Sequence, residues 1–300
     1  MTDDSLRDSY FRDGYVVAEG LIDADTLAAL RRVTDQLIDA ARHVAQSDAR
    51  FDLDSGHSAS TPRLTRIKLP HTQHAVYHDV LHSDAVRTLL TGLLGTADVR
   101  LHTSKLNCKA PGGGRAVEWH QDWAFYPHTN DNVLALGIWL DDVTEANGPL
   151  LAIPGSHAGP VLDHTRDGVF VGAIDPSDSA FAAPEARPLT GPAGSASVHH
   201  VRTLHGSAPN HSASARRVLF FECCAADAWP LAGIAGPYNG LSQAALLADL
   251  RGRMVFGELP LQPRLADVPV TMPLPPPPDD GSIFAVQRSG GAVSAFGPGN

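Results

Sequence analysis

Between about residue 97 and residue 225 the chain consists of short apolar runs separated by glycine, proline and asparagine. The runs are VRLHTSKLNCKA, AVEWHQDW, NVLALGIWLDD, PLLAIPGS, ASVHHV, TLHGSA and RRVLFFECC. Many short strands with turn residues between them are typical of an antiparallel sandwich or small barrel, and a jelly roll fits this pattern best. The sequence therefore predicts a mainly β core.

The segments before this region have a different periodicity. Residues 27–40 carry apolar side chains at helical spacing, and residues 82–95 predict a second helix. A short helix and a strand around residues 15–18 precede the first of these. Residues 45–75 are polar and predict a loop with little regular structure. We expect the N-terminal helices to pack outside the β core.

The whole chain, residues 1–300, is expected to form a single domain with its core at about 97–225. Residues 226–300 form a Pro-rich C-terminal extension with one predicted helix, SQAALLADLRGRMV. The run MPLPPPPDDGS (272–282) predicts extended, polyproline-like backbone. A tail laid across the domain is favoured there over a docking peptide for an SH3-type partner.

Composition narrows the function classes. The formal net charge of -10 argues against nucleic acid as a partner, because that binding depends on clustered Lys and Arg. No apolar run reaches the roughly 18 residues of a membrane span, and the acidic N-terminus does not resemble a signal peptide. A cytoplasmic location is expected. The three cysteines are interpreted as core thiols.

A histidine and an aspartate lie two residues apart in AVEWHQDW, at His120 and Asp122. On one strand, residues i and i+2 point to the same face, about 7 Å apart. That span suits two ligands of one metal ion. The spacing alone is weak evidence, since His82 and Asp84 repeat it at a helix start, where capping explains the aspartate.

The strongest candidate for a third ligand is His205, at the end of the run TLH. Two histidines and one carboxylate form the facial triad of non-haem Fe(II) oxygenases. Turn residues after His205 predict a hairpin that brings Arg216 back beside it. There Arg216 could hold the far carboxylate of 2-oxoglutarate, although a solvated charge at a strand edge is an equal alternative.

Four segments of the chain resemble the phytanoyl-CoA dioxygenase family of Fe(II)- and 2-oxoglutarate-dependent oxygenases. They are FRDGYVVAEGLI, WHQDWAFYP, NGPLLAIPGSH and HGSAPNHS with an arginine eleven residues after its histidine, and together they cover roughly residues 8–225.

The resemblance implies a double-stranded β-helix with iron at its mouth. It implies iron ligation by His120, Asp122 and His205, and binding of the 2-oxoglutarate C5 carboxylate by Arg216. Asn107 and Ser207 fall where relatives often add hydrogen bonds to this cosubstrate. Because the carboxylate is present, hydroxylation is favoured over halogenation, for which relatives replace it with a small residue.

The substrate side is less defined. Lys105 and Lys109 share a strand face with Asn107, and surface lysine is the default interpretation of each. Lys105 is the preferred candidate for contact with an anionic substrate. Tyr126 is a candidate roof over the substrate. Nearby histidines, including His199, are interpreted as structural residues.

The predicted function is oxidation, most simply hydroxylation, of an unactivated C–H bond of a small-molecule metabolite, with O₂ consumed and succinate and CO₂ released. Desaturation or cyclisation by the same iron chemistry is an alternative. A zinc hydrolase or a non-enzymatic jelly-roll binding protein is a rival from another class. The sequence leaves the oligomeric state open.

Overall fold

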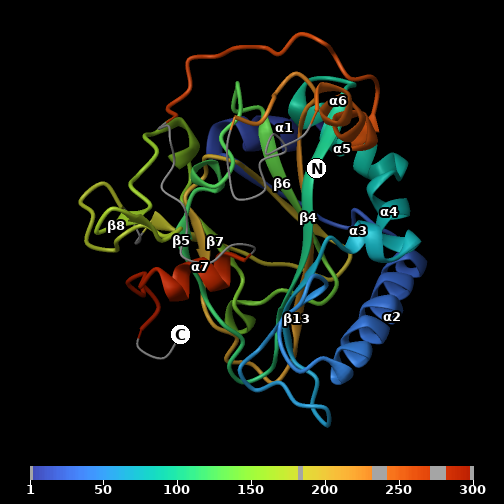
Figure 1. Ribbon diagram of the computed structural model, residues 1–300, viewed down its shortest axis with the longest axis vertical. Helices are drawn as coiled ribbons and strands as arrows, with labels where there is room; N and C mark the ends of the chain where they lie inside the picture. Colours follow the sequence, from blue (N-terminus) through green and yellow to red (C-terminus); the bar gives the residue numbers. More distant parts are fainter. Residues whose placement is uncertain (1–2, 182–184, 232–241, 271–281, 298–300) are drawn as a thin grey trace.

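The computed structural model describes residues 3–181, 185–231, 242–270 and 282–297. Within these residues two antiparallel sheets form the core (Figure 1). The larger sheet has the order β1 (Tyr15–Ala18), β11 (Ala196–His200), β6 (Val133–Trp139), β13 (Arg216–Ala225), β4 (Val99–Lys109), β3 (Leu64–Lys68) and β2 (Phe51–Leu53), and β14 (Met254–Phe256) also pairs with β4. The smaller sheet has the order β10 (Arg187–Leu189), β7 (Leu150–Ala152), β12 (His205–Ser207) and β5 (Val117–His120). The predicted jelly-roll fold is confirmed.

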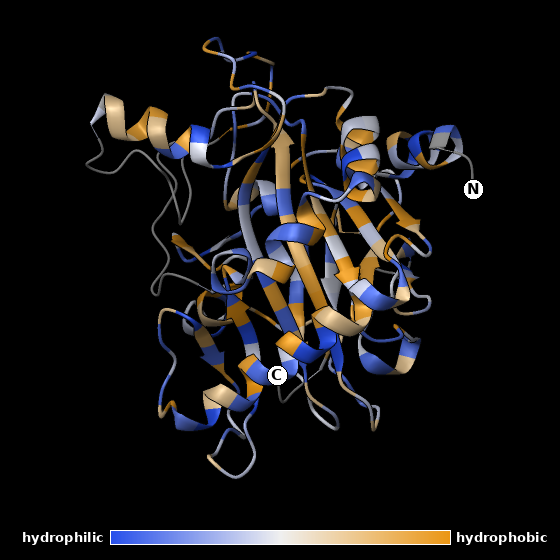
Figure 2. Ribbon diagram, turned by 90° about the vertical axis from the view of Figure 1, so that its right-hand side faces the viewer, coloured by the Kyte–Doolittle hydropathy of each residue, from blue (hydrophilic) through white to orange (hydrophobic). Residues whose placement is uncertain are grey.

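Helices from the N-terminal part cover the outer face of the larger sheet (Figure 1). They are α1 (Asp3–Asp13), α2 (Ala24–Ala40), α3 (Pro70–Gln73), α4 (Ala75–Leu81) and α5 (Asp84–Leu94). Leu30 of α2 and Leu90 of α5 are fully buried, in the same apolar cluster as Leu136 of β6 and Phe221 of β13. In Figure 2 the hydrophobic residues are concentrated along the strands and in the layer under these helices.

The boundaries of helix α5 follow from local chemistry. Ser83 accepts a hydrogen bond from the backbone N–H of Val86 at the start of the helix, and Gly95 ends it in the left-handed conformation with φ of 66°. The predicted helix at 82–95 is therefore confirmed.

The prediction of an irregular loop at 45–75 was wrong. This segment contains β2, β3 and α3, and β3 pairs with β4 through Ile67 opposite Leu106. Phe51 and Ile67 are buried in the main core. The strands were missed because both are short and are edged by polar and charged residues.

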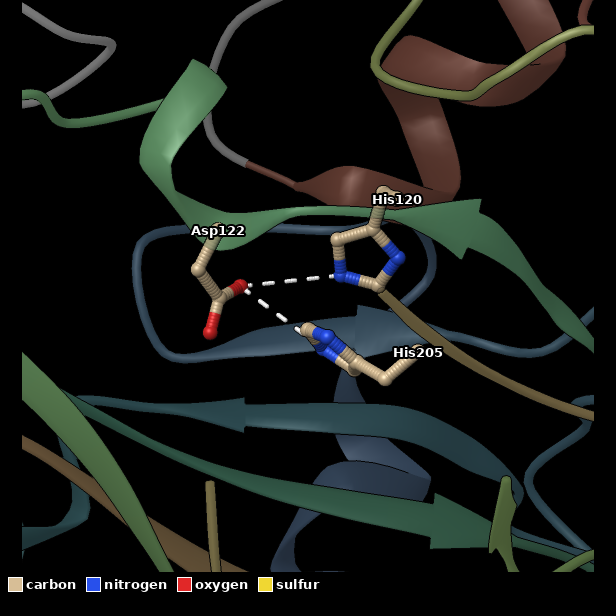
Figure 3. A group of neighbouring side chains, drawn as sticks. All are labelled: His120, Asp122 and His205. Atoms are coloured by element: carbon tan, nitrogen blue, oxygen red, sulfur yellow. Dashed lines mark ion pairs between the residues drawn. The ribbon is translucent and has the colours of Figure 1, made fainter. Parts of the chain in front are cut away.

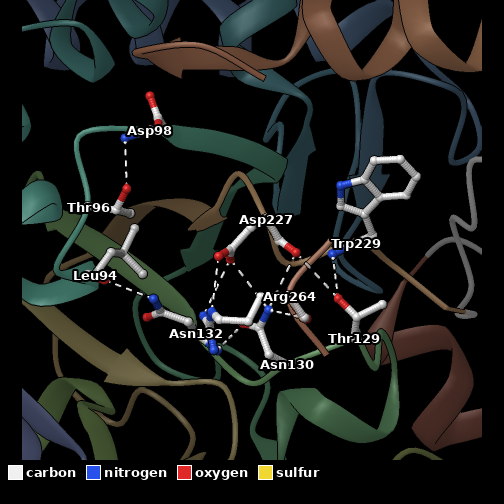
Figure 4. A network of polar contacts seen from close by, with 9 residues as sticks. All are labelled: Leu94, Thr96, Asp98, Thr129, Asn130, Asn132, Asp227, Trp229 and Arg264. Carbon is white, nitrogen blue, oxygen red and sulfur yellow. Dashed lines mark hydrogen bonds and ion pairs between the residues drawn. The ribbon is translucent and has the colours of Figure 1, made fainter. Parts of the chain in front are cut away.

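The C-terminal part returns to the core at two places. Helix α6 (Gln243–Gly252) leads into β14, and α7 (Ile283–Ser289) lies beside β5 (Figure 1). A polar network joins this part to residues 129–132, which precede β6 (Figure 4). In it Arg264 donates to Asn130 Oδ1 at 2.9 Å and pairs with Asp227 at 3.0 Å. Most of the proline run at 272–282 lies outside the described residues.

None of the described helices combines the length and the apolar composition that a bilayer span requires.

Candidate active site

The predicted metal pair lies at the end of strand β5. The strand ends at His120, and Asp122 opens a 3₁₀ turn, η2 (Asp122–Ala124). The expectation that both residues lie within one strand was therefore wrong. The turn nevertheless directs the carboxylate back toward the imidazole, with Asp122 Oδ1 3.6 Å from His120 Nε2. Trp119 and Trp123 are buried in separate apolar clusters, as packing residues.

His205 comes to the same place from the neighbouring strand. It lies directly opposite His120 in the β12–β5 ladder, and the two ring centroids are 4.1 Å apart. His205 Nε2 is 3.9 Å from Asp122 Oδ1. One ligand atom from each of the three residues lies within 4.8 Å of the others, and all three residues are buried (Figure 3). The structure thus brings the sequence-predicted triad together.

Hydrogen bonds fix which ring nitrogens face inward. His120 Nδ1 is 2.8 Å from the carbonyl of Glu118, and His205 Nδ1 is 2.9 Å from the carbonyl of Thr203. Because a carbonyl can only accept, each Nδ1 carries a proton, and Nε2 is the ring nitrogen left to bind a metal. Metal-binding histidines are commonly held in this way.

The charges of the triad also suit a cation. Burial and the neighbouring His120 and His199 hold the pKa of His205 well below 6.5, so this ring is neutral at neutral pH. Burial alone would raise the pKa of Asp122, but the surrounding histidines and Lys105 outweigh burial and hold this pKa well below 3.8. One ionised carboxylate and two imidazoles, spaced for bonds of about 2 Å, form a donor set for a divalent transition metal.

His199 is a neighbour that the sequence interpretation left outside the site. Its Nε2 lies 3.1 Å from Asp122 Oδ2, and it lines the same cavity as the triad. His199 faces inward from β11 opposite Ala135 of β6, whose small side chain leaves it room. The signal available in the sequence was the alternation in ASVHH, which places one of its two histidines on the inner face.

A cavity of about 40 Å³ lies between the two sheets, and Arg216 lines it together with the triad. The predicted hairpin between His205 and Arg216 was wrong, because β12 belongs to the smaller sheet and β13 to the larger one. Arg216 therefore faces the triad across the sandwich. It is buried and donates to the carbonyl of Gly148 at 2.6 Å, while burial lowers its pKa to about 10, so it remains charged.

Lys109, Ser207 and Asn107 surround Arg216 in the cavity. Lys109 Nζ donates to Ser207 Oγ at 2.7 Å, and no carboxylate of the described residues pairs with Lys109 or Arg216. Asn107 Oδ1 is buried without a hydrogen-bond partner in the described part of the chain. Burial and the nearby Arg216 hold the pKa of Lys109 well below 10.5, so Arg216 carries the positive charge of this group, which an anion would complete.

Lys105 also lines the cavity, so the default interpretation of both lysines as surface residues was wrong. Lys105 Nζ is paired with the buried Glu222 at 2.6 Å. Tyr126 lies close to Asp122, and burial together with this carboxylate raises the pKa of its hydroxyl well above 10. Its ring packs against His102, with centroids 4.6 Å apart.

A jelly roll that holds two histidines and a carboxylate at its mouth belongs to the class of non-haem Fe(II) oxygenases, in which three protein ligands leave positions open for other molecules. The buried arginine in the same cavity is the counterpart that a dicarboxylate cosubstrate needs.

Residues 10–218 match the family described as Phytanoyl-CoA dioxygenase (PhyH), and the chain belongs to this family. A protein of Stutzerimonas stutzeri, described as a "probable alpha-ketoglutarate-dependent hypophosphite dioxygenase", is 40% identical over 284 residues, which cover 93% of this chain and 95% of that relative. The L-proline trans-4-hydroxylase of Streptomyces griseoviridis is 35% identical over 168 residues, covering 47% of this chain and 63% of that enzyme.

The fold has a solved counterpart as well. The crystal structure of EctD from S. alaskensis with bound Fe matches with a TM-score of 0.63 and 25% identity, covering 76% of this chain and 78% of EctD. The chain is thus a dioxygenase that depends on Fe(II) and 2-oxoglutarate (alpha-ketoglutarate). This confirms the predicted reaction class, and it sets aside the zinc hydrolase and the non-enzymatic binding protein.

Proposed function

We propose that this dioxygenase oxidises a small phosphorus oxyanion of the hypophosphite type. In this proposal His120, Asp122 and His205 hold the iron, and Arg216 binds the C5 carboxylate of 2-oxoglutarate. The whole chain works as one dioxygenase unit on a small-molecule substrate. Three free, buried cysteines support a reducing compartment such as the cytoplasm.

Each part of the cavity has a separate task in this scheme. Arg216 is a buried cation that needs an anion, which 2-oxoglutarate supplies, and Lys109, Ser207 and Asn107 offer it further hydrogen bonds. When bound, iron and 2-oxoglutarate supply oxygen activation, with 2-oxoglutarate decarboxylated to succinate. The protein orients the reactants and excludes bulk water by burying the triad.

The observation that carries the substrate proposal is the 40% identity to the hypophosphite dioxygenase relative over 93% of the chain. That similarity continues beyond residues 10–218, which the family shares. The cavity agrees with it in charge, because Lys105 Nζ lines the cavity and keeps donors beyond its bond to Glu222. In this proposal Lys105 binds the substrate anion, and Tyr126 lies near the iron site without binding the substrate.

The reaction balances without a further reactant. One oxygen atom of O₂ enters a P–H bond of hypophosphite and gives phosphite, and the other enters succinate as 2-oxoglutarate loses CO₂. Hydroxylation of a C–H bond is the second candidate, supported by the 35% identity to the proline hydroxylase.

The test is a succinate assay with Fe(II), 2-oxoglutarate and one substrate at a time: hypophosphite, phosphite, L-proline or ectoine. We expect hypophosphite-dependent succinate, with one phosphite per succinate by phosphorus NMR. Lys105→Met should raise the KM for hypophosphite, whereas Lys68→Met, in β3 and paired with Asp52 at 2.8 Å, should not. Succinate formation with proline or ectoine, and none with hypophosphite, would reject this substrate in favour of C–H hydroxylation.

A further inference from the structure

The last described segment of the chain, residues 282–297, reaches the active site from outside the family region. It comprises α7 and the residues after it, and it lies beyond residues 10–218 that match the family. Ile283 and Phe284 line the cavity that contains the triad. In Figure 3 the dark red helix lies over the strand that carries His120. We call residues 282–297 the C-terminal clamp.

Gln287 of the clamp completes the open edge of strand β5. In the smaller sheet β5 pairs with β12 only, so its other edge leaves backbone groups without a strand partner in the described sheet. Gln287 Oε1 accepts from the backbone N–H of Glu118 at 3.0 Å, and Gln287 Nε2 is 3.4 Å from the carbonyl of the same residue. Nε2 also donates to the carbonyl of Gly172 at 2.9 Å. The buried amide thus substitutes for a neighbouring strand.

Glu118, the residue that Gln287 holds, also orients His120. The carbonyl of Glu118 accepts from His120 Nδ1 at 2.8 Å. The Glu118 carboxylate in turn accepts from Ser294 Oγ at 2.8 Å and from the backbone N–H of Ala295 at 2.9 Å. The clamp therefore holds Glu118 through both its backbone and its side chain.

Apolar contacts join the clamp to the same ring. Val286 is fully buried and packs with Phe125 and Phe170, and Phe125 meets His120 edge-on with ring centroids 5.8 Å apart. Phe296, at the other end of the clamp, stacks on Trp119 of β5. The imidazole of His120 is thus fixed on its backbone side and on its ring edge by contacts that depend on this segment.

We propose that the C-terminal clamp is a working part of the active site, with Gln287 as a positioning residue for His120 and Phe284 as a residue that limits substrate size. This rests on the proposed function only in treating His120 as an iron ligand and the substrate as a small ion. The hydrogen bonds of Gln287 and Ser294 to Glu118 orient the His120 imidazole. The apolar side chains of Ile283 and Phe284 form a wall of the cavity.

The positioning role is tested by Gln287→Met, which keeps the side-chain length and removes the hydrogen bonds. Anaerobic Fe(II) titration at saturating 2-oxoglutarate, followed by the visible charge-transfer absorption, measures iron affinity without turnover. We expect about tenfold weaker iron binding. Gln36→Met, at an exposed position of α2, is the matched control and should bind iron as the wild type does. A lower Tm with unchanged iron affinity would show a structural role only and overturn the positioning role.

The size limit is tested by Phe284→Ala with substrates that all keep a P–H bond: hypophosphite, methylphosphinate and phenylphosphinate. We expect the ratio of kcat/KM for phenylphosphinate over hypophosphite to rise at least about tenfold. Phe11→Ala, at a phenylalanine that is 52% exposed, should leave the ratio unchanged. An unchanged ratio in Phe284→Ala would show that Phe284 does not limit substrate size. Should Phe284→Ala not fold, Phe284→Leu replaces it and should give a smaller rise in the same ratio.

The two proposals fail in different ways. If the wild type binds iron and 2-oxoglutarate but does not oxidise hypophosphite, the substrate proposal fails while the Gln287 titration still decides the positioning role. The Phe284 comparison is then made with L-proline or ectoine and a bulkier analogue, whichever supports turnover. If Gln287→Met binds iron normally while hypophosphite is oxidised, the positioning role fails alone.

Discussion

His199 Nε2 lies 3.1 Å from Asp122 Oδ2, while the other oxygen of the same carboxylate faces His120 and His205. Oδ2 therefore accepts a hydrogen bond, and Oδ1 is left to bind a metal. A hydrogen bond of this kind fixes the rotation of a ligating carboxylate and favours ligation through one oxygen.

His199→Phe should therefore weaken Fe(II) binding by about tenfold, because Oδ2 then loses the hydrogen bond from His199. His199→Gln, which keeps a donor of similar reach, should recover part of the affinity. Anaerobic iron titration with and without 2-oxoglutarate provides the measurement, and His211→Phe, at an exposed histidine, is the control. Equal iron affinity in His199→Phe and the wild type would contradict this assignment.

Asp122→Ala should abolish substrate-dependent succinate formation while the protein remains folded, because the only carboxylate of the triad is lost. The chain offers a matched control in Asp84→Ala, which changes the aspartate of the other His-x-Asp pair at an exposed helix start. Circular dichroism checks the fold and a succinate assay checks activity. Full activity in Asp122→Ala would show that the ligand assignment is wrong.

Arg216→Met and Arg217→Met form an adjacent pair with opposite expectations. Arg216 faces the cavity, whereas Arg217 pairs with Asp141 at 2.8 Å and with Asp35 at 2.5 Å. Loss of a charge-assisted hydrogen bond worth about 1.5–3 kcal/mol should raise the KM for 2-oxoglutarate roughly 10- to 100-fold in Arg216→Met. Arg217→Met should leave that KM unchanged. Similar KM values in the two variants would remove Arg216 from the cosubstrate site.

Stability should fall on the acid side of pH 6.5, because two buried histidines are held neutral. Burial lowers the pKa of His128 to about 3 and that of His164 to about 4. His164 Nε2 accepts a hydrogen bond from the backbone N–H of Gln121 at 2.8 Å, which a protonated ring could not do. The unfolded chain binds protons below pH 6.5 that the folded chain does not, so unfolding becomes easier as the pH falls.

At pH 5 each of these histidines should cost roughly 2 kcal/mol of the stability present at pH 7.5. Urea unfolding at the two pH values measures this difference. His128→Gln should reduce it, whereas His78→Gln, at an exposed site, should not. A free energy of unfolding that is the same at both pH values would contradict the neutral state of the buried rings.

Much of the fold and the triad could be predicted from the sequence, because short strands carry a local signal. The alternation and turn residues of the core located β4, β6 and β13, and the His-x-Asp spacing located two residues of the metal site. The helix at 82–95 was predictable from its own apolar periodicity and terminal glycine.

What the sequence did not predict depends on contacts between distant segments. Gln287 lies 169 residues from Glu118 along the chain, and nothing in its own neighbourhood indicates the edge strand that it completes. The role of His199 follows from the pairing of β11 with β6, which sets the face on which the imidazole lies. Between His205 and Arg216 the chain crosses from the smaller sheet to the larger one. The sequence of this crossing resembles that of a hairpin, because both kinds of connection contain turn residues.

The most direct test of the account is a crystal structure from crystals grown without oxygen in the presence of Fe(II) and 2-oxoglutarate, with anomalous data at the iron edge. We predict one iron peak bound by Nε2 of His120, Oδ1 of Asp122 and Nε2 of His205, with the far carboxylate of 2-oxoglutarate on Arg216. A cavity without an iron peak at saturating Fe(II), or an iron peak held by other residues, would contradict it.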